Sequence, residues 1–398
     1  MVRIARVPGT SMLTPLSAKP SAPYALHDRI VRDIADAGGV TPFSRFMSIA
    51  LYEPGLGYYE RDPSIVGRRG DFQTAVSIGP LFGELLAFQI ATWLDGPGMV
   101  PSAGSLQLVE TGANDGRLMA DILGWLRTWR PQLYARIQPW ILEPSLRRRE
   151  WQRETLVQAG ISAQWAGDAE DLSRRTGGVN GVLYSNELLD AFPVHCLAWS
   201  VAPRRWQELG VACVSKQFVW QPMPENSITP ATPYLQRLSE LPPELLSVLP
   251  DGFRIEVCPA AAEWWREIAG ILQSGVHLAL DYGFPDDTAL RPEHPQGTLR
   301  AYRAHRVSGE VLVDPGEQDL TAQVDFAAVE AIGDSAGLRT LVREPQRRWL
   351  TRLFEATLKA EAGFPRWDTS RVRQFQTLTH PEHLGRRFQV LAQSRAAV

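Results

Sequence analysis

Cysteine is scarce in this 398-residue chain, and no hydrophobic run is long. The three cysteines, Cys196, Cys213 and Cys258, are far apart and form no C-x-x-C pair. Their spacing argues against a disulfide framework and a zinc site, and it is typical of a reducing compartment. No apolar run approaches the roughly 18 residues that a transmembrane helix needs. We therefore expect a protein without a membrane anchor and without a bound metal, in the cytoplasm of a bacterial-type cell.

An excess of positive charge is also missing. The chain has 41 Lys and Arg against 44 Asp and Glu, with a formal net charge of -3. No global basic field therefore exists to attract nucleic acid or an anionic membrane. Short arginine runs, such as Arg147 to Arg149, are expected to form solvated helix faces. With 44% hydrophobic and 21% charged residues, the composition is that of an ordinary globular protein.

The chain begins with a segment that has few structural signals. Residues 1–23 are expected to form a flexible arm. The first 26 residues contain no Asp or Glu and carry Arg3, Arg6 and Lys19. This composition weakly resembles an organelle transit peptide, so the mitochondrial matrix is the alternative location.

Strands and helices alternate through the first half of the chain. Apolar strands are expected at Leu106 to Glu110, Trp140 to Glu143, Ile161 to Trp165 and Gly181 to Asn186, with helices at 117–129 and 145–158 between them. A further strand is predicted at Val276 to Asp281, and a last one at Arg387 to Ala392. This alternation predicts a Rossmann-like α/β fold with a parallel sheet and helices on both faces.

Two other segments do not follow this pattern. From about Tyr24 to Ala50, apolar side chains recur at helical spacing. After Pro193, the pattern predicts short meandering strands followed by a proline-rich stretch. We therefore expect an N-terminal helical lobe with a substrate loop and an inserted cap. The expected division is 24–100 for the lobe, 101–195 for the first part of the core, 196–255 for the cap and 256–398 for the remainder of the core.

Acidic and amide side chains follow the predicted strands. In an open α/β sheet, ligands bind beyond the carboxyl ends of the strands. That rule nominates Glu110, Glu143, Asp168, Asn186 with Glu187, and Asp281. A single carboxylate there could equally cap the next helix.

A glycine loop follows the first strand of the expected core. Gly112 and Gly116 permit a tight turn and a close backbone approach, and Asn114 tolerates a left-handed conformation. Such a loop suits a nucleotide-like ligand, although a purely structural turn is the alternative. The third glycine of the dinucleotide fingerprint is absent, because Arg117 follows Gly116 directly.

Several motifs together resemble the MidA-like methyltransferases, a family with a mitochondrial arginine methyltransferase required for respiratory complex I assembly. The matching segments are Gly70 to Thr74, Gly79 to Leu86, Glu110 to Gly116, Ser185 to His195, Asp281 to Gly283, Gly297 to Tyr302 and Asp319 to Phe326. The chain departs from the family pattern at Asn114, where a glycine is usual, and at Val76-Ser77, where a Pro-Glu pair is usual.

The resemblance implies a seven-stranded class I methyltransferase core, S-adenosyl-L-methionine as the donor and a protein arginine as the acceptor, in a partner such as a respiratory-chain subunit. By motif position, Glu110, Gly112 and Gly116 would hold the methionine portion, Glu143 the ribose and Asp168 the adenine edge. The remaining positions expected to bind the cofactor are Asp71, Thr74, Asn114 and Asn186.

A guanidinium acceptor requires carboxylates that hold it and accept its proton. Glu187 and Asp190 are three residues apart, so on a helical turn they would point the same way. We therefore expect this pair to be the catalytic clamp, although Asp190 could instead only stabilise the turn before Pro193. The alternatives are a methyltransferase for a small molecule or another nitrogen, and an assembly factor that has lost catalysis.

Overall fold

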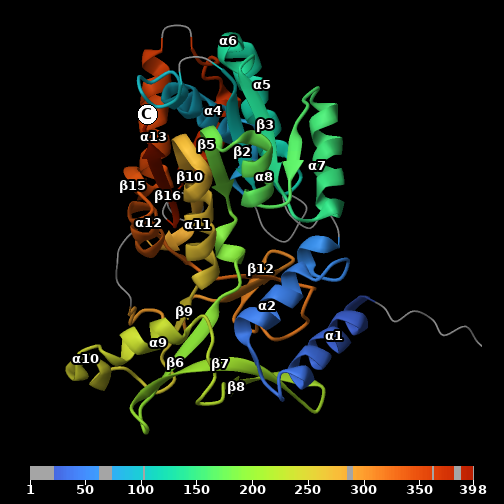
Figure 1. Cartoon of the computed structure of the whole chain (residues 1–398), viewed down its shortest axis with the longest axis vertical. Coiled ribbons are helices and arrows are strands. Elements are labelled where there is room, and N and C mark those ends of the chain that lie inside the picture. Colours follow the sequence, from blue (N-terminus) through green and yellow to red (C-terminus); the bar gives the residue numbers. More distant parts are fainter. Residues whose placement is uncertain are drawn as a thin grey trace, which may run out of the picture.

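The computed structural model describes residues 22–61, 74–101, 104–284, 290–360, 363–380 and 387–397. Figure 1 shows two tiers, with a large α/β layer above and a smaller sheet with helices below. The predicted flexible arm, except for its last two residues, and the predicted cofactor residue Asp71 lie outside the described residues.

The upper tier is built on an eight-stranded sheet, and seven of its strands lie in the order β15-β16-β10-β5-β2-β3-β4. The strands from β10 to β4 are parallel to their neighbours, whereas β16 is antiparallel to both β10 and β15. Their bounds are β2 (Leu106–Thr111), β3 (Ile137–Leu142), β4 (Gln164–Ala166), β5 (Val179–Asn186), β10 (Leu272–Phe284), β15 (Arg339–Pro345) and β16 (Phe388–Arg395), and β14 (Val324–Asp325) pairs with the end of β10.

Helices cover both faces of this sheet because the strands carry apolar residues on both sides. On β2, Leu106 and Leu108 face one hydrophobic cluster, whereas Val109 faces another. The first face is covered by α4 (Leu81–Leu94), α5 (Arg117–Trp129), α7 (Leu146–Gln158), α13 (Gln346–Lys359) and α14 (Thr369–Thr379). The second face carries α8 (Ala169–Thr176), α11 (Pro259–Ile271) and α12 (Phe326–Ser335). Among the shorter helices, α3 spans Ala75–Ile78 and α6 spans Pro131–Tyr134.

The lower tier is a five-stranded sheet in which β7 lies between β1 and β6, β9 follows β6, and β8 also pairs with β7. Helices α1 and α2 pack on one face, and α9 and α10 pack on the other. The bounds are β1 (Thr41–Pro42), β6 (His195–Ser200), β7 (Arg205–Val214), β8 (Gln217–Pro222), β9 (Arg254–Val257), α1 (Ala22–Asp36), α2 (Phe43–Tyr52), α9 (Thr232–Ser239) and α10 (Pro243–Ser247). The N-terminal helices and the inserted strands therefore share one hydrophobic core.

The lower tier differs in two ways from what the sequence predicts. The helical stretch from Tyr24 to Ala50 is broken, because Gly38 and Gly39 have φ values of 82° and 103° and the chain then forms β1. A small sheet, β12-β11-β13, also joins this core from much later in the chain. Its strands are β11 (Arg300–Arg303), β12 (Arg306–Ser308) and β13 (Asp319–Thr321).

In the described part of the chain, no helix is both long and apolar enough to cross a bilayer.

His277 is an unusual member of the central strand β10. Its ring is fully buried, stacks on Trp265 with 3.6 Å between centroids, and neither ring nitrogen has a hydrogen-bond partner among the described residues. This burial lowers the pKa of His277 to about 3. The folded protein therefore holds a neutral imidazole at pH values where the unfolded chain binds a proton.

We predict that His277→Phe reduces the loss of stability in acid. Between the ordinary histidine pKa and about 3, proton binding by the unfolded chain lowers the free energy of unfolding as pH falls, by at most about 1.4 kcal/mol per pH unit. Urea unfolding at several pH values measures this slope. His305→Asn, in an exposed turn, is the control and should keep the wild-type slope. Equal slopes in wild type and His277→Phe would contradict the prediction.

Candidate active site

The carboxyl ends of the central strands meet at the edge of the sheet that faces the lower tier (Figure 1). Thr111 on β2 pairs with Leu142 on β3 and Ser185 on β5, and Asn186 pairs with Leu280 on β10. Residues that follow these positions therefore share one edge. Glu110, Glu143, Glu187 and Asp281 are brought to this edge, as the strand-end rule predicts.

The glycine loop after β2 adopts the backbone that the sequence suggests. Gly112, Asn114 and Gly116 have φ values of 71°, 45° and 84°, all in the left-handed region. A Cβ on Gly112 would lie 2.8 Å from Leu188 Cδ1, so this position is tightly packed against the β5 end. Gln152 donates to the Asn114 carbonyl at 3.2 Å, which ties the loop to α7.

Glu110 lies on β2 immediately before this loop and is almost fully buried. Its Oε2 accepts a hydrogen bond from the Tyr184 hydroxyl at 3.1 Å. Burial raises the pKa of Glu110 to about 8, and the hydrogen bonds from Tyr184 and the Met119 backbone oppose this rise. A cation close to Glu110 would therefore favour the ionised form of this buried carboxyl.

Glu143 follows β3 and is fully buried, and protein donors surround its carboxylate. Oε1 accepts from the Ser145 backbone at 3.0 Å and from Arg148 Nη2 at 2.8 Å, and Oε2 accepts from Gln152 at 3.0 Å. A carboxylate has about four lone-pair sites. A ribose hydroxyl at Glu143 must therefore replace Arg148 or use the remaining site on Oε2.

The arginine run at the start of α7 is not simply a solvated face. The Arg148 side chain is 15% exposed and also lies 3.8 Å from Glu60, and Arg149 Nε donates to the Glu143 carbonyl at 2.7 Å. The expectation of a solvated face was therefore wrong for these two arginines. Both arginines contact Glu143, five and six residues earlier, and only the contact of Arg148 with Glu60 joins distant segments.

Asp168 and Thr74 both act as helix caps. Asp168 is exposed, and its Oδ1 accepts from the Asp171 backbone at 2.7 Å at the start of α8. Thr74 Oγ1 accepts from the Ser77 backbone at 3.2 Å at the start of α3. The cofactor roles expected for these two residues stay predictions, and their hydrogen bonds here are those of N-caps.

Glu187 directly follows β5 and is only partly buried. Its Oε1 accepts from the Ala75 backbone at 3.1 Å and from Asn186 Nδ2 at 3.1 Å. Loss of water around the carboxyl raises the pKa of Glu187 to about 7. Glu187 has φ 53°, and the helical turn begins only at Leu189, so the turn on which we placed the pair does not include Glu187.

Asp190 nevertheless lies near Glu187 in a cluster with Asp281 and Asp319. Both Asp281 and Asp319 are fully buried. Asp281 Oδ2 accepts from the Leu188 and Leu189 backbone at 2.9 and 2.7 Å, and burial raises the pKa of Asp281 to about 6. Burial, followed by the charges of Asp281, Asp319 and Glu187, raises the pKa of Asp190 well above its ordinary value. The structure thus gathers four carboxyls from three separate segments.

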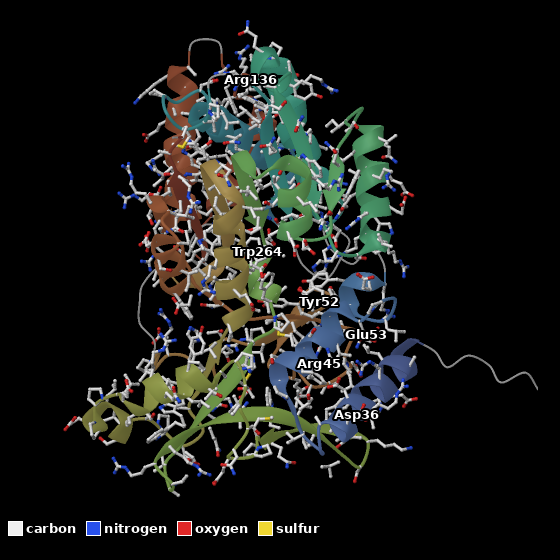
Figure 2. All side chains as sticks on the ribbon, in the orientation of Figure 1. Asp36, Arg45, Tyr52, Glu53, Arg136 and Trp264 are labelled. Atoms are coloured by element: carbon white, nitrogen blue, oxygen red, sulfur yellow. The ribbon has the colours of Figure 1, made fainter. Side chains whose placement is uncertain are left out.

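Two tyrosines of the lower tier reach this cluster. The Tyr59 hydroxyl donates to Asp319 Oδ1 at 2.8 Å, and the Tyr52 hydroxyl donates to the Ala191 carbonyl at 2.8 Å. Figure 2 shows Tyr52 at the end of α2, where the lower tier meets the core. Sequence reasoning missed Asp319, Tyr52 and Tyr59 as site residues. Asp319 was already part of a family motif, which was the available signal.

No group of three or more His, Cys, Asp or Glu side chains within the described ranges is arranged to hold a metal ion.

Comparison with known proteins shows the family and the fold. Residues 85–343 match the model of a family of S-adenosyl-L-methionine-dependent methyltransferases. A Burkholderia thailandensis protein in complex with S-adenosyl-homocysteine has a crystal structure that superposes with a TM-score of 0.80, at 30% identity over 97% of this chain and 95% of that one. The predicted α/β methyltransferase core is thereby confirmed.

Mitochondrial proteins are among the similar sequences. The protein arginine methyltransferase NDUFAF7 of Mus musculus is 29% identical, with 90% of this chain and 82% of that protein covered. The homologue from Drosophila melanogaster is 27% identical, with 89% of this chain and 81% of that protein covered.

The residues at the strand edge fit an adenosyl sulfonium ligand. Asn186 Oδ1 is buried and has no hydrogen-bond partner among the described residues, so it can accept from a ligand donor. Glu110 offers a buried carboxyl near the glycine loop, and the left-handed loop brings backbone close to the same edge. These features suit the cationic methionine portion of the donor.

We predict that Gly112→Ala weakens S-adenosyl-homocysteine binding at least about tenfold. An L-residue in the left-handed region costs about 1–2 kcal/mol, and the new methyl would press on Leu188. Calorimetry measures the affinity, and thermal unfolding checks the fold. Gly124→Ala, in α5 with open space around it, is the control and should bind normally. Unchanged affinity in Gly112→Ala would show that this loop does not approach the ligand.

Proposed function

The chain belongs to this family of S-adenosyl-L-methionine-dependent methyltransferases, and we propose that its acceptor is an arginine side chain of a partner protein. The observation that carries the proposal is the cluster of Glu187, Asp190, Asp281 and Asp319. A guanidinium stays protonated at any physiological pH and binds carboxylates in a planar, bidentate manner. Glu187, Asp190 and Asp281, whose pKa values are raised, therefore gain most from such a cation.

Glu187 is proposed as the residue that holds the acceptor and takes its proton. Both of its protein donors reach Oε1, so Oε2 is left for a guanidinium N–H. The bound donor supplies a methyl group on a sulfonium sulfur. When the arginine nitrogen gains that methyl it must lose one proton, and a carboxylate with a pKa near 7 is suited to accept it.

Asp190 and Tyr59 are proposed to position the acceptor. Asp190 shares a hydrogen bond with Asp281, and its backbone carbonyl accepts from Ala322 at 2.9 Å. Tyr59 holds Asp319, and both residues belong to the lower tier, because β13 packs into its core. The acceptor arginine would therefore enter between the two tiers, with Glu187, Asp190 and Asp281 on the core side and Asp319 with the tyrosines on the lower side.

The names of the relatives support a protein substrate, because the mouse and fly proteins are called protein arginine methyltransferases. We further propose a respiratory-chain subunit as the partner, as the resemblance to the MidA-like family implies. The proposed location is the cytoplasm of a bacterial-type cell, and the mitochondrial matrix is the alternative, because the mouse and fly relatives are named as mitochondrial proteins.

Transfer of labelled methyl groups tests the acceptor. The purified protein is incubated with methyl-labelled S-adenosyl-L-methionine and a membrane-depleted extract of respiratory subunits, and labelled peptides are sequenced by mass spectrometry. We expect label on arginine. Label on lysine, histidine or a small molecule alone would contradict the arginine proposal and leave the methyltransferase assignment intact.

Two isosteric variants separate the donor from the acceptor. Glu143→Gln should weaken S-adenosyl-homocysteine binding by about tenfold or more, because a charge-assisted hydrogen bond is lost. Glu187→Gln should keep donor affinity and lower the turnover rate roughly 100-fold or more, because a general base is lost. Calorimetry and the labelling assay measure the two quantities. The reverse pattern would exchange the two assigned roles.

The transfer rate should rise with pH. Glu187 accepts a proton only when it is ionised, and its pKa of about 7 places this change between pH 6 and 8. At saturating donor, kcat/KM for the acceptor should increase about tenfold across this range. A profile that is flat or falls with pH would exclude Glu187 as the proton acceptor in the free enzyme.

A further inference from the structure

A separate cavity of about 70 Å³ lies where β9 of the lower tier meets the segments that follow β10. This volume exceeds the roughly 10–15 Å³ that one water needs. Its polar lining includes Arg254, Glu256, Arg291, Thr298, Gln323 and Asp325.

Hydrogen bonds connect the lining of this cavity to the segment that carries Asp190. The Gln323 backbone donates to Thr298 Oγ1 at 3.1 Å, and the preceding residue, Ala322, donates to the Asp190 carbonyl. On the same side, Gly283 of β10 pairs with Val324 of β14. A peptide whose arginine entered the acidic cluster would therefore pass close to this cavity.

The acidic side chains of the cavity already have donors. Glu256 Oε2 accepts from the Thr298 backbone at 2.8 Å and from the Thr298 hydroxyl at 2.9 Å. Asp325 accepts from the Ala328 backbone at 3.0 Å, as the N-cap of α12. Glu256 thus fills both acceptor sites of Oε2 within the protein, and Asp325, which is exposed, fills one of its sites.

Arg254, in contrast, has donor capacity left. Its Nε is buried and has no hydrogen-bond partner among the described residues. No acidic side chain in the described ranges forms an ion pair with it, and its guanidinium lies 5.2 Å from the Trp220 ring centroid. Stacking on an aromatic ring holds the guanidinium plane but satisfies none of its five N–H donors.

A second positive charge lies in the same lining. The Arg291 guanidinium stacks 3.4 Å from the Phe284 ring centroid and forms an ion pair with Glu293 at 3.8 Å. The lining thus contains two guanidinium groups and two carboxylates, and what it leaves open is the Nε–H of Arg254. A carboxylate is the acceptor that forms the strongest hydrogen bond with such a charged donor.

We propose that this cavity is a specificity subsite that binds the carboxylate of an acidic residue near the acceptor arginine in the substrate protein. The inference rests on the proposed arginine acceptor, because it places the acidic residue on the same peptide. Arg254 would bind the carboxylate through its Nε–H. Methylation would then select arginines that have an acidic neighbour at one fixed spacing.

A peptide series tests the selection. Each heptapeptide contains one arginine and one glutamate, and the position of the glutamate differs from peptide to peptide. A second peptide with glutamine in place of the glutamate is the control for each one. At saturating donor, we expect kcat/KM to favour glutamate at one position by about tenfold or more, because a charged hydrogen bond is gained. Arg254→Gln should remove that preference and keep the rate on the glutamine peptide. Arg266→Gln, an exposed arginine on α11, is the matched control and should keep the preference.

A binding measurement on the wild-type protein needs neither a variant nor catalysis. The Nε–H resonance of Arg254 is followed by nuclear magnetic resonance during titration with capped glutamate, and separately with capped glutamine. We expect a saturable shift with capped glutamate only. Binding of capped glutamate without methylation of any peptide would support the subsite and count against the arginine acceptor. Methylation without a glutamate preference and without a shift would overturn the subsite and leave the acceptor assignment standing.

Discussion

The close approach of buried carboxyls at one edge of the sheet is the constraint that shapes this molecule. Like charges that are removed from water repel each other and lose hydration, so each group needs compensation. Asp281 receives it from backbone N–H groups, Asp319 from the Tyr59 hydroxyl, and Glu187 from the Ala75 backbone. The compensation is incomplete, since the pKa values of Asp190, Asp281 and Glu187 remain raised. A cationic ligand would complete it.

This constraint also explains why residues from both tiers contact the acidic cluster. The donors to the carboxyls come from the segment after α2, the start of α3 and the turn after β5. Asn186, which also donates to Glu187, is the last residue of the central strand β5. A mutation that loosened the contact between the tiers would therefore disturb the acidic cluster, even though the core stayed folded. The proposed subsite at Arg254 uses the same junction, where a strand of the lower tier meets loops of the core.

The sequence predicted the core well because its signals are local. Apolar strands that end in Glu110, Glu143 and Asn186, with helices between them, are enough to place these residues at one edge by the general rule for parallel sheets. The pairing of Glu187 with Asp190 had a different basis. A helical spacing was predicted, whereas Glu187 has a left-handed backbone and the helical turn begins only at Leu189. Asp319 and Tyr59 could not be placed at all, because their positions depend on contacts between segments far apart in the chain. Arg148 was misjudged for a different reason: its run of arginines is typical of a solvated face, but its partner Glu143, only five residues earlier, is fully buried.

Proton release on acceptor binding tests the central claim most directly. Capped arginine and capped citrulline are titrated into the protein with S-adenosyl-homocysteine at pH 6.5, in buffers with different ionisation enthalpies. If the acidic cluster receives a guanidinium, carboxyls with raised pKa values must ionise, so arginine binding should release on the order of one proton and citrulline none. Arginine binding without proton release, or equal binding of citrulline, would contradict the account.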